Sequence, residues 1–212
     1  MSQCANGRSY NLNFELIMNL MKHHIITLLL CILMLGACGH KKEQIAPKPK
    51  GYFRIDLPKA EYTLLDTTLP FTMEVSKHAQ AVITPKDSGK IWIDLQYPQF
   101  AAELKMTYFP MHGNLRDRMV QEREMVQFHY VKADDVEYSI ISDPESRMFG
   151  QIYDIEGSDV ATPFQFWVSD SSYHFLRGSL YFNFPPNNDS IQPVIDYLRN
   201  DLLQLVNTLQ WR

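Results

Sequence analysis

The sequence is short of cysteine and glycine, carries no excess of charge of one sign and contains no long apolar run. Its 212 residues include nine glycines and three cysteines, which excludes collagen-like and low-complexity architectures. The net charge of −4 provides no basic field of the kind that binds nucleic acid. The apolar run at residues 25–35 is shorter than the roughly 20 residues that a helix needs to cross a bilayer. These absences leave a single globular domain preceded by an unusual N-terminus.

The signatures of common enzyme classes are also missing. There is no GxxxxGK[ST] or GxGxxG phosphate-binding loop, no HExxH zinc motif and no GxSxG nucleophile elbow. No two of the histidines after Cys38 have the spacing of metal ligands on one element. We therefore expect no catalytic, cofactor-binding or metal-binding residues, and a protein that is not an enzyme.

Two residues still have the chemistry of weak catalytic candidates. His112 lies in a His-Gly-Asn turn into a predicted helix, where it fits a general base or, as we favour, a surface or capping group. Glu122 falls in the middle of the apolar face of that helix, where burial would raise its pKa and suit it to proton transfer. The favoured alternative is an ion pair with Arg118, one turn earlier, on a solvated helix face.

A targeting signal begins at Met21. The polar residues 22–24 precede the apolar residues 25–35, which have the length of a signal-peptide core. This core runs into the letters LGAC at residues 35–38, which resemble the lipobox of bacterial lipoproteins. A thiol is nucleophilic enough to accept a diacylglyceryl group, so we expect Cys38 to be lipidated. The alternatives are a plain secretory peptide and a short buried helix with a chance cysteine.

This interpretation divides the chain into four segments. Residues 1–20 are a misassigned N-terminal extension, 21–37 the signal peptide, 38–50 the lipidated cysteine and a tether, and 51–212 one periplasmic domain. Translation then starts at Met21, or alternatively at Met18. Of the three cysteines only Cys38 remains, so no disulfide can form within the processed chain.

The tether, GHKKEQIAPKPK at residues 39–50, is basic and has no apolar periodicity. Its lysines are suited to lie over anionic lipid headgroups. No acidic cluster follows Cys38. That pattern resembles sorting to the outer membrane with the domain facing the periplasm, and it lacks the acidic signal that sends some lipoproteins to the cell surface.

Two helices are predicted in the domain. The first spans residues 113–130 with Asn114 as its N-cap. The second spans residues 189–209, with Asp189 or Ser190 as its N-cap and Pro193 in its first turn. The second helix carries a continuous apolar stripe along its whole length, so it is expected to pack against a sheet.

Alternating apolar residues and turn signals predict nine strands around these helices. The predicted class is α+β, a mostly antiparallel sheet covered by helices. The strands are expected at residues 52–57, 71–76, 79–84, 90–97, 102–109, 137–142, 148–155, 163–169 and 173–183.

The last two predicted strands form a hairpin that is apolar on both faces. Helices covering both sides of the sheet would explain this, and we favour that alternative. The other alternative is an aromatic patch that one side presents to a partner. In that case Trp167, Tyr173 and Tyr181 are the candidate partner-binding residues.

Three further segments, together with the lipobox, resemble one known family. They are PKPKGYFRIDLP at residues 47–58, YFPMHGNLRDRM at residues 108–119, and the hairpin at residues 162–182. The combination resembles the gliding motility lipoprotein GldD family of Bacteroidetes over residues 21–212. Only the first 20 residues depart from it, as a misassigned start would explain.

The resemblance implies a non-enzymatic component of gliding motility and type IX protein secretion, without a cofactor. It implies a lipid anchor in the outer membrane and association with the lipoproteins GldB, GldJ and GldK. The strand order also looks like the Mog1/PsbP α/β/α sandwich, which is a topological analogy. We therefore expect a scaffold that binds and stabilises partner lipoproteins. The alternative is a periplasmic ligand-binding or chaperone-like module with a pocket between sheet and helices near His112.

Overall fold

The computed structural model describes residues 17–28, 54–65 and 68–212. The chain divides into two units, Met1–Lys50 and Gly51–Arg212. In the first unit, residues 17–28 are helical. None of the helices in the described ranges is both long and apolar enough to cross a bilayer. Cys38 and the tether at residues 39–50 lie outside the described residues.

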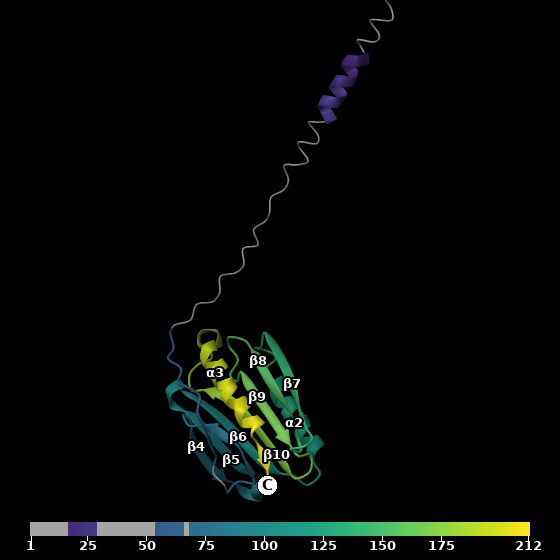
Figure 1. Ribbon diagram of the computed structural model, residues 1–212. Helices are drawn as coiled ribbons and strands as arrows, with labels where there is room; N and C mark the ends of the chain where they lie inside the picture. The colour runs from purple at the N-terminus through teal and green to yellow at the C-terminus, as the bar shows by residue number, and fades with distance from the viewer. Residues whose placement is uncertain (1–16, 29–53, 66–67) are drawn as a thin grey trace, which may run out of the picture. The chain divides into compact units, whose positions relative to one another are not determined.

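The second unit is built on a seven-stranded antiparallel sheet with the order β4-β5-β6-β10-β9-β8-β7 (Figure 1). The central strand, β10, pairs with β6 on one side and with β9 on the other. The strands span β4 Gln80–Pro85, β5 Ile91–Tyr97, β6 Ala102–Pro110, β7 Asp135–Asp143, β8 Met148–Glu156, β9 Phe164–Ser169 and β10 His174–Phe182. Short 3-10 turns, η2 (Asp87–Gly89) and η3 (Pro98–Phe100), flank β5. The predicted α+β class and the mostly antiparallel sheet are confirmed.

Burial follows the strand alternation that the sequence predicts. In β5, Ile93, Leu95 and Tyr97 are buried in the main core while Trp92 points to the other face. All six residues of β9 are buried, because both faces of the sheet are covered at that strand.

Helix α3 (Asn188–Asn207) covers one face of the sheet with the predicted apolar stripe. Leu198, Leu202 and Leu205 are fully or almost fully buried in the main core. The helix begins one residue earlier than predicted, after Asn187, and no side chain caps it. At this end of the helix, the side-chain amide of Asn188 donates to the carbonyls of Gly157 and Val160, both at 2.9 Å. Pro193 consequently lies beyond the first turn.

Helix α2 (Leu115–Gln127) covers the opposite face and closes a second, smaller core (Figure 1). It is shorter than the predicted helix at both ends. Asn114 is the N-cap residue, as predicted, but its side chain makes no capping bond to the helix. Its Oδ1 instead accepts the backbone N–H of His112 at 3.3 Å.

Four short strands flank the main sheet, and two of them escaped prediction. Strand β1 (Tyr62–Leu64) pairs with β3 (Glu74–Ser76), and β2 (Phe71–Thr72) pairs with β11 (Gln210–Trp211). The predicted strand at 71–76 is therefore split in two. The predicted strand at 52–57 lies partly outside the described residues, and its described part, 54–57, has no regular structure. Strands of two or three residues are too short to show a period of two.

Candidate partner-binding surface

Most residues of the aromatic hairpin, β9 and β10, are buried in the core. Trp167 is only 5% exposed and stacks on Phe175, with ring centroids 5.6 Å apart. Tyr173 is 67% exposed in the β9–β10 turn. Tyr181 is half-buried near the other end of β10. Eight residues of extended chain separate the two tyrosines by about 25 Å, so the three predicted residues do not form one surface.

The turn that exposes Tyr173 is held by one carboxylate. Asp170 Oδ1 accepts the backbone N–H groups of Ser172, Tyr173 and His174 at 2.8–2.9 Å. Although burial opposes it, these bonds lower the pKa of Asp170. The carboxylate therefore organises the turn from which Tyr173 extends into solvent.

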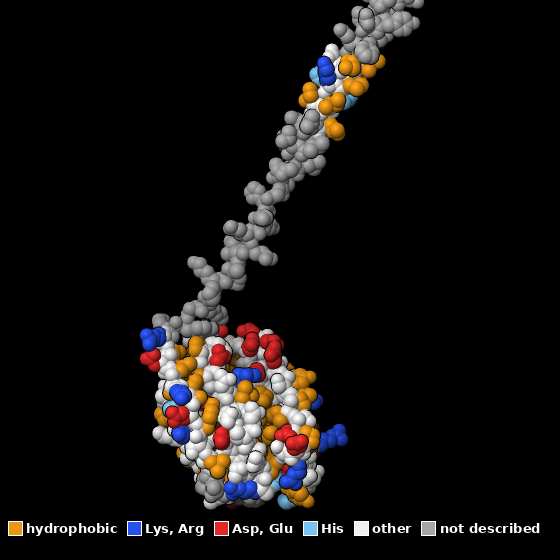
Figure 2. Space-filling view, in the orientation of Figure 1, with side chains coloured by type: hydrophobic (Ala, Val, Ile, Leu, Met, Phe, Trp, Pro, Cys, Tyr) orange, Lys and Arg blue, Asp and Glu red, His pale blue; other side chains and the backbone are white. Residues whose placement is uncertain are grey.

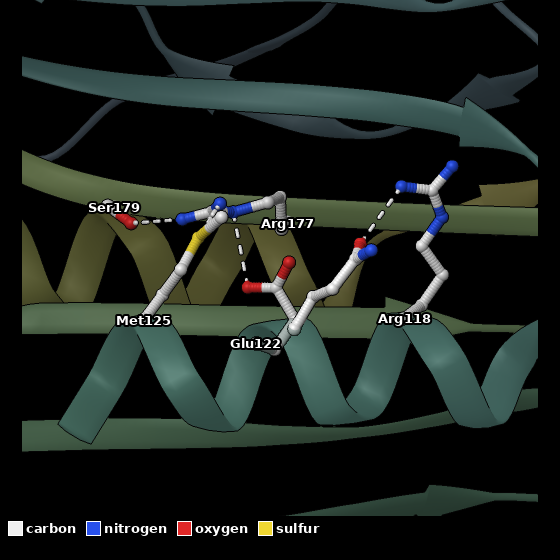
Figure 3. A network of polar contacts seen from close by, with 6 residues as sticks. Arg118, Glu122, Met125, Arg177 and Ser179 are labelled. Carbon is white, nitrogen blue, oxygen red and sulfur yellow. Dashed lines mark hydrogen bonds and ion pairs between the residues drawn. The ribbon is translucent and has the colours of Figure 1, made fainter.

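Glu122 lies on the inner side of α2, against the sheet, and its partner differs from the prediction. It is 6% exposed, and its Oε2 lies 3.2 Å from Nε of Arg177 on β10 (Figure 3). Arg177 also contacts the Met125 sulfur and donates to Ser179 at 3.4 Å. Burial raises the pKa of Glu122 to about 7, although Arg177 lowers it. The expected solvated helix face is therefore wrong at this position.

Arg118 also faces the sheet rather than pairing with Glu122. Its guanidinium lies 4.0 Å from the centre of the Phe109 ring, and its Nη1 donates to Gln121 at 3.3 Å (Figure 3). The inner side of α2 thus combines charged and apolar side chains, and Glu122 and Val126 are its two buried residues. Sequence periodicity points to Met119 and Tyr130 instead, but both are exposed.

A polar groove of about 440 Å³ opens on the α2 face of the sheet. Its cations have acidic partners: Lys105 lies 3.3 Å from Glu103, and Arg177 pairs with Glu122. The groove is lined by Lys105, Thr107, Arg177, Ser179, Tyr181, Phe182 and Asn183. His112 is exposed and does not line this groove, although the sequence placed the candidate pocket near it. In the described part of the chain, no three His, Cys, Asp or Glu residues are grouped as metal ligands.

Asp201 is a buried acid that sequence analysis missed. It lies on the apolar stripe of α3, is 2% exposed and accepts the Tyr62 hydroxyl at 3.0 Å. Burial raises the pKa of Asp201, and burial together with this bond raises the pKa of Tyr62 to about 12. The spacing of Asp201, three residues after Leu198, could have revealed it. The pair attaches β1 to α3.

Within the described part of the second unit, more than half of the exposed large apolar side chains lie in one stretch of chain, which we call the 119–140 segment. It runs from α2 through the following loop into β7. Phe128 and Val131 are 79% and 91% exposed, which is unusual for large apolar residues. The members are Met119, Val120, Met125, Phe128, Tyr130, Val131, Tyr138 and Ile140.

Comparison with known families identifies the chain. The model of the family described as gliding motility lipoprotein GldD matches residues 42–211. The chain belongs to the gliding motility lipoprotein GldD family. No curated protein and no solved structure matches it significantly.

Membership of the GldD family confirms the resemblance derived from the four sequence segments. The family is one of lipoproteins of gliding motility, and its description is not that of an enzyme family. The Mog1/PsbP likeness stays an analogy, because no solved structure matches. The lipid attachment site predicted at Cys38 lies outside both the described residues and the matched range.

Proposed function

We propose that this GldD-family lipoprotein is a non-enzymatic scaffold that binds and stabilises partner lipoproteins of gliding motility and type IX protein secretion. GldB, GldJ and GldK are the proposed partners. The proposed location is the periplasmic side of the outer membrane, with the lipid on Cys38 as anchor. The single observation that carries the binding role is the exposure of the 119–140 segment, because large exposed apolar groups of this density are typical of interaction sites.

The proposed mechanism is avidity. A lipid on Cys38 and a tether of twelve residues, 39–50, hold the domain within about 40 Å of the membrane. Partners anchored in the same layer then meet it at a high effective concentration. A modest apolar interface is sufficient under these conditions.

The alternative is a periplasmic ligand-binding or chaperone-like module. It is supported by the polar groove at Tyr181, whose volume of about 440 Å³ is in the range of small-molecule sites. Its lining of hydroxyl groups and paired charges suits a polar ligand.

The test is co-purification of the tagged full chain from outer membranes after mild crosslinking, read by mass spectrometry. We expect lipoproteins to be enriched with the wild-type chain and lost with Cys38→Ser, which should release a folded, soluble protein. Phe128→Ser should reduce the enrichment about fivefold. Leu64→Ser, an exposed apolar residue on β1, is the matched control and should leave it unchanged.

Two results would contradict the scaffold. One is a wild-type chain that enriches no lipoprotein. The other is a chain that co-purifies with a small molecule and no partner protein, and this would support the ligand-binding alternative. Persistence of Cys38→Ser in the membrane, with no lipid on the wild type, would contradict the anchor.

A further inference from the structure

The two edges of the main sheet differ in how they are protected. Strand β4 has six residues and ends in Pro85, which cannot donate to a neighbouring strand. Strand β7 has nine residues, pairs with β8 from Asp135 to Asp143 without a bulge, and contains no proline or lysine. Among the described residues no strand pairs with its outer side. A long, regular edge of this kind is a template for another strand.

The backbone groups on the outer side of β7 can be assigned. The N–H of Val136 donates to the carboxylate of its neighbour Asp135 at 2.8 Å, not to β8. In an antiparallel pair, successive residues point their backbone groups alternately toward and away from the partner strand. The N–H and C=O groups of Tyr138, Ile140 and Ser142 therefore also point away from β8. They form a row of donors and acceptors along the edge.

The side chains of β7 separate by face. Tyr138 and Ile140, 63% and 72% exposed, point to the α2 face, opposite Tyr153 and Gln151 of β8. In Figure 2, hydrophobic side chains line the edge where β7 lies. One face of the edge therefore offers apolar contact to an added strand.

The other face of β7 is acidic at one end. Asp135 and Glu137 are exposed and lie opposite Glu156 and Asp154 of β8. Of these four acids, Asp154 has a bidentate partner, the Arg199 guanidinium of α3, at 2.6 and 2.7 Å. Acidic side chains gather over the upper end of β8 in Figure 2. This face favours a positively charged neighbour.

We propose that the β7 edge binds an extended basic segment of a partner protein, which joins the sheet as an eighth strand. Side chains opposite Tyr138 and Ile140 are apolar and cover them, while those opposite Asp135 and Glu137 are lysine or arginine. The segment therefore alternates apolar and basic residues. This inference rests on the proposed scaffold function and names the kind of partner segment that the scaffold takes.

Charge argues against a second copy of this chain as the occupant. In the antiparallel register that pairs all nine residues of β7 with a copy of itself, Asp135 lies opposite Asp143 at both ends. Like charges directly opposite each other destabilise a strand pair. A basic segment turns the same positions into attractive pairs.

The binding test uses the full chain in detergent micelles at about 0.15 M salt, where weak surface attractions are screened. The probe is a nine-residue peptide of alternating lysine and valine, and its counterpart alternates glutamate and valine. We expect the lysine peptide to shift the amide NMR signals of Tyr138, Ile140 and Ser142. The glutamate peptide should bind about tenfold more weakly or not at all. Equal binding of both peptides, or shifts confined to other strands, would overturn the proposal.

Two matched variants locate the site. Ile140→Lys removes an apolar contact and sets a charged group against the apolar side chains of the bound segment. Val82→Lys adds the same charge on β4, at a residue that is 44% exposed on the other edge. We expect about tenfold weaker binding for Ile140→Lys and no change for Val82→Lys. Ile140→Pro, which removes one outward N–H, should also weaken binding. Equal effects of the two lysine variants would contradict the proposal.

Repeating the co-purification with Ile140→Lys separates this inference from the scaffold. Loss of the partner lipoproteins with Ile140→Lys, but not with Val82→Lys, supports both. Full enrichment with Ile140→Lys overturns the proposal of strand addition at the β7 edge but does not contradict the scaffold function. A wild-type chain that enriches nothing, while the lysine peptide still binds at β7, overturns the scaffold alone.

Discussion

Helices α2 and α3 of the second unit cover opposite faces of one sheet, but they pack against it with different kinds of side chain. Helix α3 buries eight of its twenty residues, most of them apolar. Helix α2 buries two of thirteen, Glu122 and Val126, and leaves Met119, Val120 and Met125 at least 40% exposed. A helix whose apolar side chains point into the core contributes stability. A helix that exposes them is available to a partner, and its attachment depends on a few polar contacts.

The strongest test of this comparison is a core truncation in α3. Leu202→Ala removes a side chain with no exposed surface and leaves a cavity, so the free energy of unfolding should fall by about 2–5 kcal/mol. Val120→Ala on α2, at a residue that is 50% exposed, should change it by about 0.5 kcal/mol or less. Urea unfolding followed by circular dichroism measures both. Similar losses would mean that α2 is as structural as α3.

The second test is the pH dependence that Glu122 gives to α2. Its pKa is raised from 4.5 to about 7, so the folded state retains a proton that the unfolded state has lost between these values. This contribution is fully present below pH 4.5 and is lost as the pH rises through about 7, at a cost on the order of 3 kcal/mol.

The variant Glu122→Gln should therefore show a flatter stability profile than the wild type across this pH window. Glu124→Gln, an exposed acid on the same helix, is the control and should follow the wild type. Denaturant midpoints at pH 4.5, 6 and 8 are the measurement. Parallel profiles for all three proteins would show that Glu122 keeps an ordinary pKa.

A smaller effect is expected where α3 holds β1. Tyr62→Phe removes the hydrogen bond to the buried carboxylate of Asp201 and should cost about 2 kcal/mol. Tyr138→Phe, which alters an exposed tyrosine on β7, is the control and should be nearly neutral. Urea unfolding compares the two. A neutral Tyr62→Phe would mean that apolar contacts alone attach β1.

The smallest effect on stability is expected on the outer side of the 119–140 segment. Phe128→Ser should change the free energy of unfolding by about 0.5 kcal/mol or less, because the side chain is 79% exposed. The same variant should lose lipoprotein partners in the co-purification test. A large destabilisation would instead assign Phe128 a structural role.

The difference between α3 and α2 also explains which parts of the fold could be predicted from the sequence. Leu198, Leu202 and Leu205 repeat at helical spacing over a long element, so α3 and its inner face were predictable. The inner face of α2 was not, because the partners of Arg118 and Glu122 are Phe109 and Arg177, which lie on strands distant in the sequence.

The candidate surface was predicted less well than the fold. Trp167 and Tyr173 belong to the same hairpin, but one is buried and the other exposed. The sequence shows that both faces of this hairpin are apolar, but which part α2 covers depends on tertiary packing. The exposure of Phe128 was missed because the helix was predicted to continue to residue 130, whereas it ends at Gln127.

The position of β10 has a consequence for the order of events during biogenesis. The three-stranded units β4-β5-β6 and β9-β8-β7 meet only through β10, which is the last strand of the main sheet to leave the ribosome. Closing the sheet is therefore a long-range step that waits for residues 174–182, and such steps are slow. Until that segment is available, the two three-stranded units cannot join into one sheet.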